Sequence, residues 1–360
     1  MQKVHLTLFA GAMAMATAGL LPAQTAEIKM AEQTYKNITQ LKGTPADQLV
    51  PAMQFISSSL GVECNFCHVQ GKMDADEKPQ KKVAREMMAM TAAINTNAFH
   101  GQRQVTCYSC HHGSQRPTNT PPVLDSDAPQ RTEARPAAPA GTAPTAADIL
   151  DKYVAALGGA DAIKKTTSRV MKGSIHAGGS DTPIELFTKA PNKRISISHM
   201  GGGESITAFD GTVGWMSNTG RPVHEMSPAE SEAAGLDAEF ALALRLKEMF
   251  QQLRPGRPEE INGVQCVSLF GTRQGKPPVR FYFDAKTGLL QRLVRYGETP
   301  MGRNPTQIDY ADYREVDGVK IPFRWTLSRP NGRFTIQIAE VTANVPVDDA
   351  RFAKPSGDVK

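Results

Sequence analysis

Two pentapeptides carry the residues best suited to chemistry in this chain, CNFCH at 64–68 and CYSCH at 107–111. Both have the pattern Cys-x-x-Cys-His. Two intervening residues let both sulfurs reach the two vinyl groups on one edge of a porphyrin, and the adjacent histidine then offers iron a nitrogen ligand. The pattern predicts two covalently attached c-type haems. Their expected attachment sites are Cys64, Cys67, Cys107 and Cys110, and the expected iron ligands are His68 and His111.

Other chemistry is open to cysteine pairs of this spacing. A single copy could be a redox Cys-x-x-Cys pair, and two copies could together supply zinc with four thiolates. Neither alternative explains why a histidine follows each pair directly. Five cysteines are also too few for a disulfide scaffold in a chain of 360 residues. We therefore expect haem rather than zinc.

The sixth iron ligand decides what a haem does, because a thioether favours the reduced state and electron transfer, whereas an open position favours ligand chemistry. Before the first motif, residues 44–61 predict a helix that begins near Thr44 and Pro45 and ends at Gly61. Pro51 is expected to kink this helix or to begin its second half. Met53 is the only methionine in the segment.

A second helix is predicted before the second motif. Val83, Met87, Met90 and Ile94 fall on one of its faces. A methionine stripe of this kind more commonly packs in a core than binds metal. The pattern alone does not choose between Met87 and Met90.

Composition limits the class of protein. The chain has 41 Lys and Arg against 36 Asp and Glu, a net charge of +5, and 40% hydrophobic residues. This small surplus of positive charge does not indicate a nucleic-acid-binding protein, and the apolar fraction is sufficient to form hydrophobic cores. Residues 1–26 combine Lys3, an uncharged apolar run and small residues at Ala23 and Ala26. They predict a secretory signal peptide that is cleaved near Ala23 to Ala26, and hence a periplasmic protein.

Three segments follow. Residues 27–113 predict a small α-helical domain with both motifs, and residues 114–145 a Pro/Ala-rich linker. Residues 146–360 begin with an amphipathic helix to about Leu157 and continue as about eleven short alternating runs, which predict an antiparallel β-rich domain. One or two helices are expected between Ser227 and Leu253. The predicted fold class is α+β, with an antiparallel half-barrel and helices.

The segment from about Ala31 to Gly113 resembles the cytochrome c subunit of photosynthetic reaction centres. The stretches that carry the resemblance are PAMQFI…GVECNFCH and REMMAMTAAINTN…VTCYSCHHG. In that family each haem unit is a helix, a turn and Cys-x-x-Cys-His, and the helix donates the sixth ligand. Carried over to this chain, the resemblance implies Met53 and Met87 as axial ligands.

The chain also departs from that family. The reaction-centre subunits usually carry four haem units and only two motifs occur here, so His100 and His112 are expected to be ordinary neighbours rather than ligands. The resemblance implies redox partner proteins, including a membrane-bound reaction centre or another electron-transfer complex, and functions in electron transport and photosynthesis. A globule of about 87 residues has a radius of gyration of ~12 Å, so the two irons are expected to lie close together.

Two alternatives stay open. A haem enzyme such as a peroxidase would need an open iron and a distal acid–base group, for which His100 is the nearby candidate. Dihaem peroxidases resemble this chain in motif number, but their motifs lie farther apart in sequence. We therefore expect an electron-transfer protein and not an enzyme.

The second alternative concerns the C-terminal part. The stretches DYREVDGVKIPFRWTL and VRFYFDAKTGLLQRLVRY resemble periplasmic lipoprotein carriers, whose fold is a half-open β-barrel around helices. That resemblance implies a lipid at the C-terminal domain. A module that only docks the cytochrome near a partner is the competing interpretation.

Overall fold

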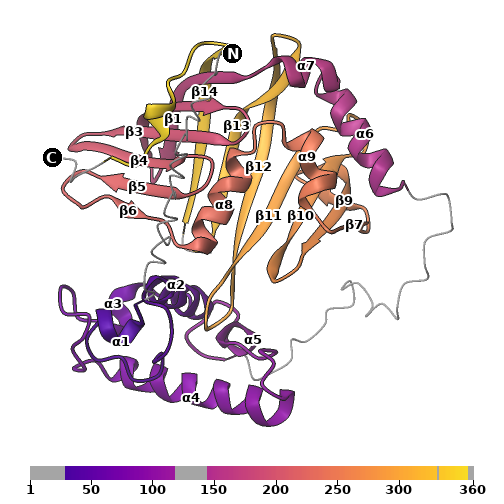
Figure 1. Ribbon diagram of the computed structural model, residues 1–360. Helices are drawn as coiled ribbons and strands as arrows, with labels where there is room; N and C mark the ends of the chain where they lie inside the picture. Colours follow the sequence, from indigo (N-terminus) through magenta and orange to yellow (C-terminus); the bar gives the residue numbers. More distant parts are fainter. Residues whose placement is uncertain (1–28, 118–143, 331, 356–360) are drawn as a thin grey trace, which may run out of the picture.

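The computed structural model describes residues 29–117, 144–330 and 332–355. A group of helices from the N-terminal part lies below a large curved sheet from the C-terminal part (Figure 1). The predicted signal peptide and most of the predicted linker lie outside the described residues. Helices together with one large antiparallel sheet confirm the α+β class.

The N-terminal part contains five α-helices and a 3₁₀ turn in its described residues. They are α1 (Ala31–Thr34), η1 (Ala46–Gln48), α2 (Leu49–Leu60), α3 (Cys64–Cys67), α4 (Pro79–Phe99) and α5 (Cys107–His111). The first predicted helix begins later than expected, at Leu49, after η1. Pro51 falls in its first turn, where no intrahelical N–H partner is needed, so it produces no kink. Gly61 ends α2 in the left-handed region, with φ 64°.

A small apolar cluster holds the N-terminal part together. Its buried members are Ala31, Leu41, Leu49, Ala52, Phe55, Ile56 and Met301. Met301 comes from the C-terminal part, so this core is completed by a residue that lies more than two hundred positions away in the sequence. The cluster buries one side of α2, which also carries Met53.

The C-terminal part is built around one sheet. The order of its strands is β6-β5-β4-β3-β2-β1-β14-β13-β12-β11-β10-β9-β7, and β8 pairs with β9. All strand pairs are antiparallel. The structure has fourteen strands in its described residues, where the sequence predicted about eleven, because short edge segments such as β6, β7 and β8 give weak alternation.

The strands have the following bounds: β1 (Ser168–Ala177), β2 (Ser180–Lys189), β3 (Lys193–Met200), β4 (Gly203–Phe209), β5 (Gly214–Asn218), β6 (His224–Glu225), β7 (Gln252–Pro255), β8 (Glu259–Ile261), β9 (Val264–Arg273), β10 (Lys276–Asp284), β11 (Leu290–Glu298), β12 (Arg303–Val316), β13 (Val319–Arg329) and β14 (Gly332–Ala343). A short 3₁₀ helix, η2 (Asp349–Phe352), follows the last strand.

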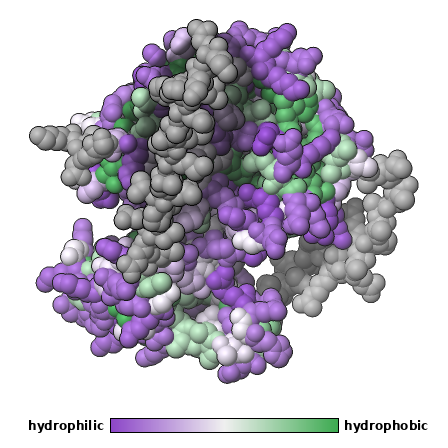
Figure 2. Space-filling view, viewed as in Figure 1, coloured by the Kyte–Doolittle hydropathy of each residue, from purple (hydrophilic) through white to green (hydrophobic). Residues whose placement is uncertain are grey.

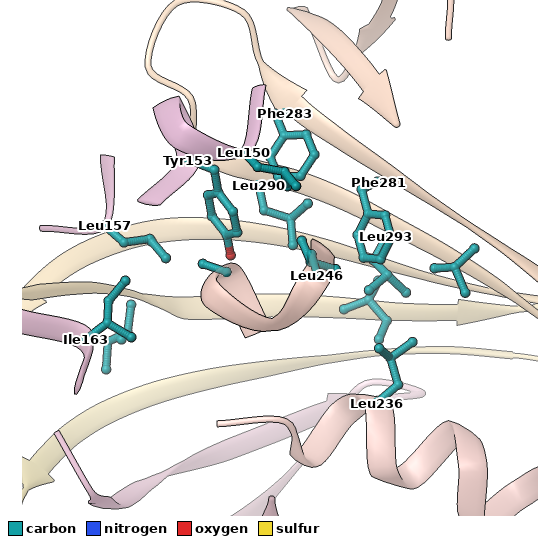
Figure 3. Packing of buried hydrophobic residues seen from close by; sticks show 14 of the residues in the cluster. Leu150, Tyr153, Leu157, Ile163, Leu236, Leu246, Phe281, Phe283, Leu290 and Leu293 are labelled. Carbon is teal, nitrogen blue, oxygen red and sulfur yellow. The ribbon is translucent and has the colours of Figure 1, made fainter. Parts of the chain in front are cut away.

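Four helices complete the C-terminal part: α6 (Ala146–Ala156), α7 (Ala160–Lys165), α8 (Pro228–Ala238) and α9 (Leu242–Met249). Thr145 caps α6 by accepting a hydrogen bond from the Asp148 N–H, as the sequence indicated. The last two helices lie between Ser227 and Leu253, where one or two helices were expected. Apolar side chains of three of these helices pack on the sheet (Figure 3). They are Leu150 and Tyr153 of α6, Leu236 of α8 and Leu246 of α9, and they face Phe281, Phe283 and Leu293 of the sheet.

Candidate haem-binding site

Each Cys-x-x-Cys-His motif folds as a single helical turn, α3 for the first and α5 for the second. The ring of the motif histidine is oriented in the same way in both. His68 Nδ1 lies 2.8 Å from the carbonyl oxygen of Met73, and His111 Nδ1 lies 2.9 Å from the carbonyl oxygen of Ser114. A carbonyl oxygen only accepts, so Nδ1 carries the proton and donates in both rings. The Nε2 lone pair is thereby left available to bind a metal ion.

The four motif cysteines are thiols and not disulfides. Cys64 and Cys110 are exposed, whereas Cys67 and Cys107 are half-buried. Burial raises the pKa of the Cys67 thiol, and the charge of Lys78 acts in the opposite direction. Burial likewise raises the pKa of the Cys107 thiol. Each motif therefore presents two separate free sulfurs, one exposed and one half-buried.

Helix α4 contacts both motif helices. Near its start, the Lys81 ammonium donates to the carbonyl oxygens of Met73, at 2.9 Å, and Ala75, at 2.8 Å. Near its end, the Asn95 side chain donates to the Val105 carbonyl and accepts from the Gln104 and Val105 N–H groups. One helix thus fixes the loop after the first motif and the segment before the second. Spacing arguments did not identify Lys81 or Asn95, because both bind backbone atoms and leave no motif in the sequence.

Helix α2 carries Met53, which is half-buried against the apolar cluster of the N-terminal part. This helix packs on α5, the turn of the second motif. The closest approach is at the glycines, where Gly113 N donates to Ser59 O at 2.9 Å and a Cβ on Gly61 would lie 2.1 Å from Gly113 O. The two motif units are therefore packed into a single small unit.

The methionine stripe of α4 lies on the surface. Val83 is 52%, Met87 37% and Met90 44% exposed, and the only buried residues of the helix are Lys81 and Thr91. The residue of this run that packs on the apolar cluster is Met88 instead. The general expectation that such a stripe packs in a core is wrong for this helix. Met87 and Met90 both remain accessible to a ligand on the surface of α4.

Exposed large apolar side chains concentrate in the N-terminal part. Among the described residues they are Tyr35, Val50, Met73, Val83, Met87, Met90, Phe99 and Tyr108, with Met200 as the one example from the C-terminal part. Figure 2 shows paler and greener surface along the lower edge of the helical part, over α4. Exposed apolar surface at this density marks a binding face. Together with four free thiols and two histidines whose Nε2 is available, this surface is chemically suited to porphyrin faces.

The two remaining histidines of this region end helices. His100 and His112 both adopt the left-handed conformation at helix C-termini, after α4 and α5, and both are exposed. His112 also packs edge-to-face on Tyr108, with ring centroids 5.4 Å apart. Their positions follow from backbone capping.

The described residues contain no group of three or more His, Cys, Asp or Glu that could hold a metal ion. The four motif cysteines therefore do not converge on one tetrahedral zinc site, which was the alternative to haem. None of the described helices is long and apolar enough to cross a membrane.

A second candidate site lies inside the curved sheet. A cavity of about 420 Å³ is lined by α6, α8 and several strands, with Tyr153, Tyr310, Tyr313 and Trp325 among its walls. Burial raises the pKa of all three tyrosines. The size lies within the range of small-molecule sites, ~300–1,000 Å³. The cavity is therefore large enough to hold an apolar ligand.

Cationic side chains also line this cavity. Burial lowers the pKa of Arg169 to about 10, and its guanidinium stacks on the Phe240 ring at 4.4 Å from the ring centroid. No carboxylate pairs with Arg169 within the described ranges. Asp237, by contrast, is paired with Arg295 at 2.5 Å. An uncompensated cation in a largely apolar wall favours an anionic ligand group.

Comparison with known proteins supports the N-terminal resemblance. The family model for the photosynthetic reaction centre cytochrome C subunit matches residues 7–174. A photosynthetic reaction center cytochrome c subunit from Thermochromatium tepidum is 29% identical over 139 residues, which is 38% of this chain and 32% of that protein. The corresponding subunit from Rubrivivax gelatinosus is 33% identical over 91 residues, 24% of this chain and 25% of that protein. The predicted resemblance is confirmed, and the chain spans about a third or less of these relatives.

A solved structure is similar to part of this chain. It is a LolA superfamily protein from Nitrosomonas europaea, with a TM-score of 0.41 and 13% sequence identity. The alignment covers 59% of this chain and 99% of that structure.

Proposed function

We propose that this chain, related over its N-terminal part to reaction-centre cytochrome c subunits, is an exported electron-transfer protein with two covalently bound haems. One observation carries the proposal. Two Cys-x-x-Cys-His turns have the same histidine geometry, Nδ1–H on a backbone carbonyl and Nε2 left for iron, within one compact helical unit. A bound haem would supply a one-electron redox centre at each turn.

Different residues of the chain would attach the two porphyrins and bind the two irons. Cys64 and Cys67 would attach one porphyrin, and Cys107 and Cys110 the other, through their free thiols. His68 and His111 would each supply one axial nitrogen. We propose Met53 and Met87 as the opposite axial ligands, which follows from the family resemblance and is compatible with their half-buried and exposed positions on α2 and α4.

Six-coordinate irons favour electron transfer over catalysis, because no position is open to a substrate. The names of the relatives also describe cytochromes and not haem enzymes. The packing of α2 on α5, and of α4 on both motif turns, supports two haems within a short distance. The pair would act as a relay between a donor and an acceptor.

The first test is the covalent load of the mature protein. Intact-mass measurement of protein matured with the haem attachment machinery should show two haem adducts. Changing Cys64 and Cys67 to Ala should remove one adduct, and changing Cys107 and Cys110 to Ala the other. A mature protein with no adduct would refute the proposal. The Cys266→Ala variant is the control and should keep both.

Axial ligation is tested by spectroscopy. The absorption band of methionine–iron(III) ligation should be present at both haems, and Met53→Ala and Met87→Ala should each remove about half of it. Met90→Ala separates the two candidates on α4 and should leave the band intact. Stoichiometric carbon monoxide binding by the unmodified, reduced protein would instead indicate open irons and a haem enzyme.

Location and partner follow from the same proposal. Covalent haem attachment and the apolar N-terminal segment are typical of an exported protein. Because the relatives are named as reaction-centre subunits, we propose that the redox partner is a membrane-bound electron-transfer complex, such as a photosynthetic reaction centre.

The cavity in the sheet supports a second function for the C-terminal part. Its volume of about 420 Å³, its aromatic walls and the uncompensated Arg169 suit one acyl chain with an anionic head. We propose lipid carriage as this second function. Native mass spectrometry of the full-length protein should show a bound lipid, and Arg169→Met should reduce its retention. If the Arg169→Met variant retained the lipid, the proposed anionic head group would be wrong. If the protein bound no lipid after reconstitution with fatty acid, the proposal of lipid carriage would be wrong.

A further inference from the structure

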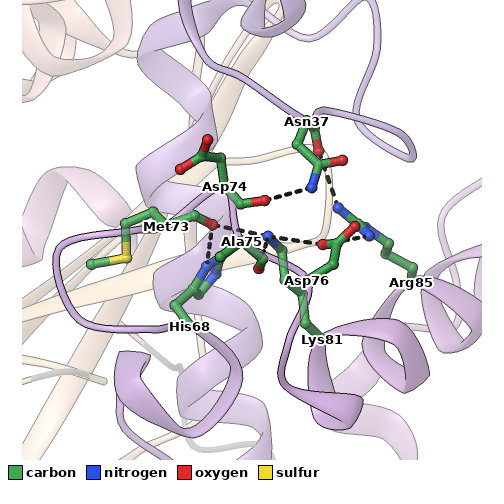
Figure 4. Close-up of polar contacts among 8 residues, drawn as sticks. All are labelled: Asn37, His68, Met73, Asp74, Ala75, Asp76, Lys81 and Arg85. Atoms are coloured by element: carbon green, nitrogen blue, oxygen red, sulfur yellow. Dashed lines mark hydrogen bonds and ion pairs between the residues drawn. The ribbon is translucent and has the colours of Figure 1, made fainter.

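Lys81 is the most unusual polar residue of the helical part. Its side chain lies on α4 and the residue is only 8% exposed. Lysine is almost never buried to this extent unless its charge is compensated. Three oxygens compensate it here, the Met73 and Ala75 carbonyls at 2.9 and 2.8 Å and Asp76 Oδ1 at 3.2 Å (Figure 4).

One of these oxygens also belongs to the first motif. The Met73 carbonyl accepts from Lys81 Nζ and, at 2.8 Å, from the Nδ1–H of His68. A carbonyl oxygen has two lone pairs and can accept both hydrogen bonds. Lys81 and His68 are therefore coupled through a single atom, and Figure 4 shows both side chains directed toward it.

The loop that carries this carbonyl is held from several sides. Asp76 also pairs with Arg85 at 3.0 Å, and Arg85 Nη2 donates to the Asn37 carbonyl at 3.1 Å. Asn37 Nδ2 in turn donates to the Asp74 carbonyl at 2.5 Å. Of the charged side chains in this network, Lys81 is the one that shares an acceptor atom with the His68 ring.

The second motif has a simpler environment. His111 Nδ1 donates to the Ser114 carbonyl at 2.9 Å. Within the described parts of the chain, no ammonium or guanidinium group donates to that oxygen. The two histidines thus share one geometry but differ in the charge that acts on their acceptor.

We propose that Lys81 is a positioning residue for the first proximal histidine and that it makes the two haems inequivalent, with the higher reduction potential at the first. The inference rests on the proposed function. An ammonium on the Met73 carbonyl withdraws electron density from it, so this oxygen is a weaker acceptor for the His68 Nδ1–H. A weaker hydrogen bond makes the imidazole a poorer electron donor to iron and favours the reduced state. The positive charge of the Lys81 ammonium acts in the same direction, because it disfavours the additional positive charge of oxidised iron.

The test compares two adjacent lysines in the full-length, haem-loaded protein. Lys81→Met removes the buried charge, whereas Lys82→Met removes an exposed charge from the next position of the same helix. Spectroelectrochemical titration should show that Lys81→Met lowers one of the two potentials and narrows the gap between them. Lys82→Met should leave both unchanged, and Lys81→Arg should largely preserve the gap because a guanidinium still donates to backbone oxygens.

Equal shifts of both potentials, or no shift, in Lys81→Met would overturn the inference. A second measurement needs no variant. In the reduced protein labelled with ¹⁵N-histidine, the Nδ1–H proton of His68 should resonate upfield of that of His111, and the opposite order would also overturn it. Absence of covalent haem would instead refute the proposed function, so the two failures are distinct.

Discussion

Arg103 and Glu298 join the two parts of the chain by an ion pair of 2.6 Å. Arg103 lies in the segment before the second motif, and Glu298 ends β11 in the sheet. The same guanidinium also donates to the Thr299 carbonyl, while Asn304 of β12 donates to the Pro51 carbonyl of α2 at 3.0 Å. The tip of the β11–β12 hairpin is therefore seated on the helical part (Figure 1).

Met301 at this tip should contribute more stability than its position in a hairpin would indicate. It is 8% exposed and belongs to the apolar cluster around Phe55 and Ile56. Truncation of a buried methionine costs about 2–5 kcal/mol, so Met301→Ala should lower the free energy of unfolding by about 2 kcal/mol or more. Met200→Ala is the control, because Met200 is 58% exposed. Calorimetry should also show the helical transition separating from the sheet transition in Met301→Ala, and a single unchanged transition would contradict the seating of the hairpin.

Substitution of Gly61 should be destabilising for two reasons, its left-handed backbone and its close contact with Gly113. Comparison with Gly43 separates the two effects. It has φ +64°, and a Cβ would lie 2.1 Å from the Gly113 carbonyl oxygen. Gly43 has φ +74° but no heavy atom within 4 Å of an added Cβ. The left-handed conformation costs an L-residue roughly 1–2 kcal/mol in both variants. Chemical denaturation should therefore show a larger loss for Gly61→Ala than for Gly43→Ala, and equal losses would mean that α2 and the second motif are not in contact.

The Cys266 thiol should be unreactive toward alkylating reagents in the folded, haem-loaded protein. It is fully buried, and burial raises its pKa from 9.0 to about 11. Four of the five cysteines would be thioethers, so a maleimide should find no reactive thiol in the native protein and one after denaturation. Because the folded pKa lies above the unfolded value, the stability contributed by the neutral thiol is complete below pH 9. It is lost as the pH rises through about 11, and Cys266→Ala should remove this alkaline component from the pH dependence of unfolding.

Asp76 should give the helical part an acid-sensitive component. The hydrogen bond from Arg85 is the main cause that holds the pKa of this carboxyl below its usual 3.8, and Asn37 and Lys81 act in the same direction. A depressed folded pKa means that the stability is present above pH 3.8 and is lost as the pH falls through the folded value. Unfolding followed between pH 5 and pH 2 should be less pH-dependent in Asp76→Asn, whereas Asp74→Asn, whose side chain is outside the network, should match the unmodified protein.

Local patterns in the sequence were sufficient for several elements. Thr145 and Asp148 indicated the start of α6, and Gly61 the end of α2, because capping and left-handed glycine depend on residues a few positions apart. The two Cys-x-x-Cys-His turns were identified for the same reason, as all of their chemistry lies within five residues.

The sequence was less informative where an element meets a distant partner. The apolar stripe of α4 indicated a packed face at Val83 and Met90, yet the face that packs carries Lys81, Met88 and Thr91. Periodicity shows that a helix has an apolar side, but it does not show whether protein atoms cover that side.

The sequence by itself determined which atoms are available for chemistry, since the identity and spacing of Cys64, Cys67 and His68, and of their counterparts at 107–111, are properties of the covalent chain. The tertiary structure decided how those atoms are held. The Lys81 contact to the Met73 carbonyl and the seating of Met301 on α2 join residues that no short-range pattern connects. Such contacts depend on how the chain folds in space, because burial and hydrogen bonding act between neighbours in the structure whatever their separation along the chain.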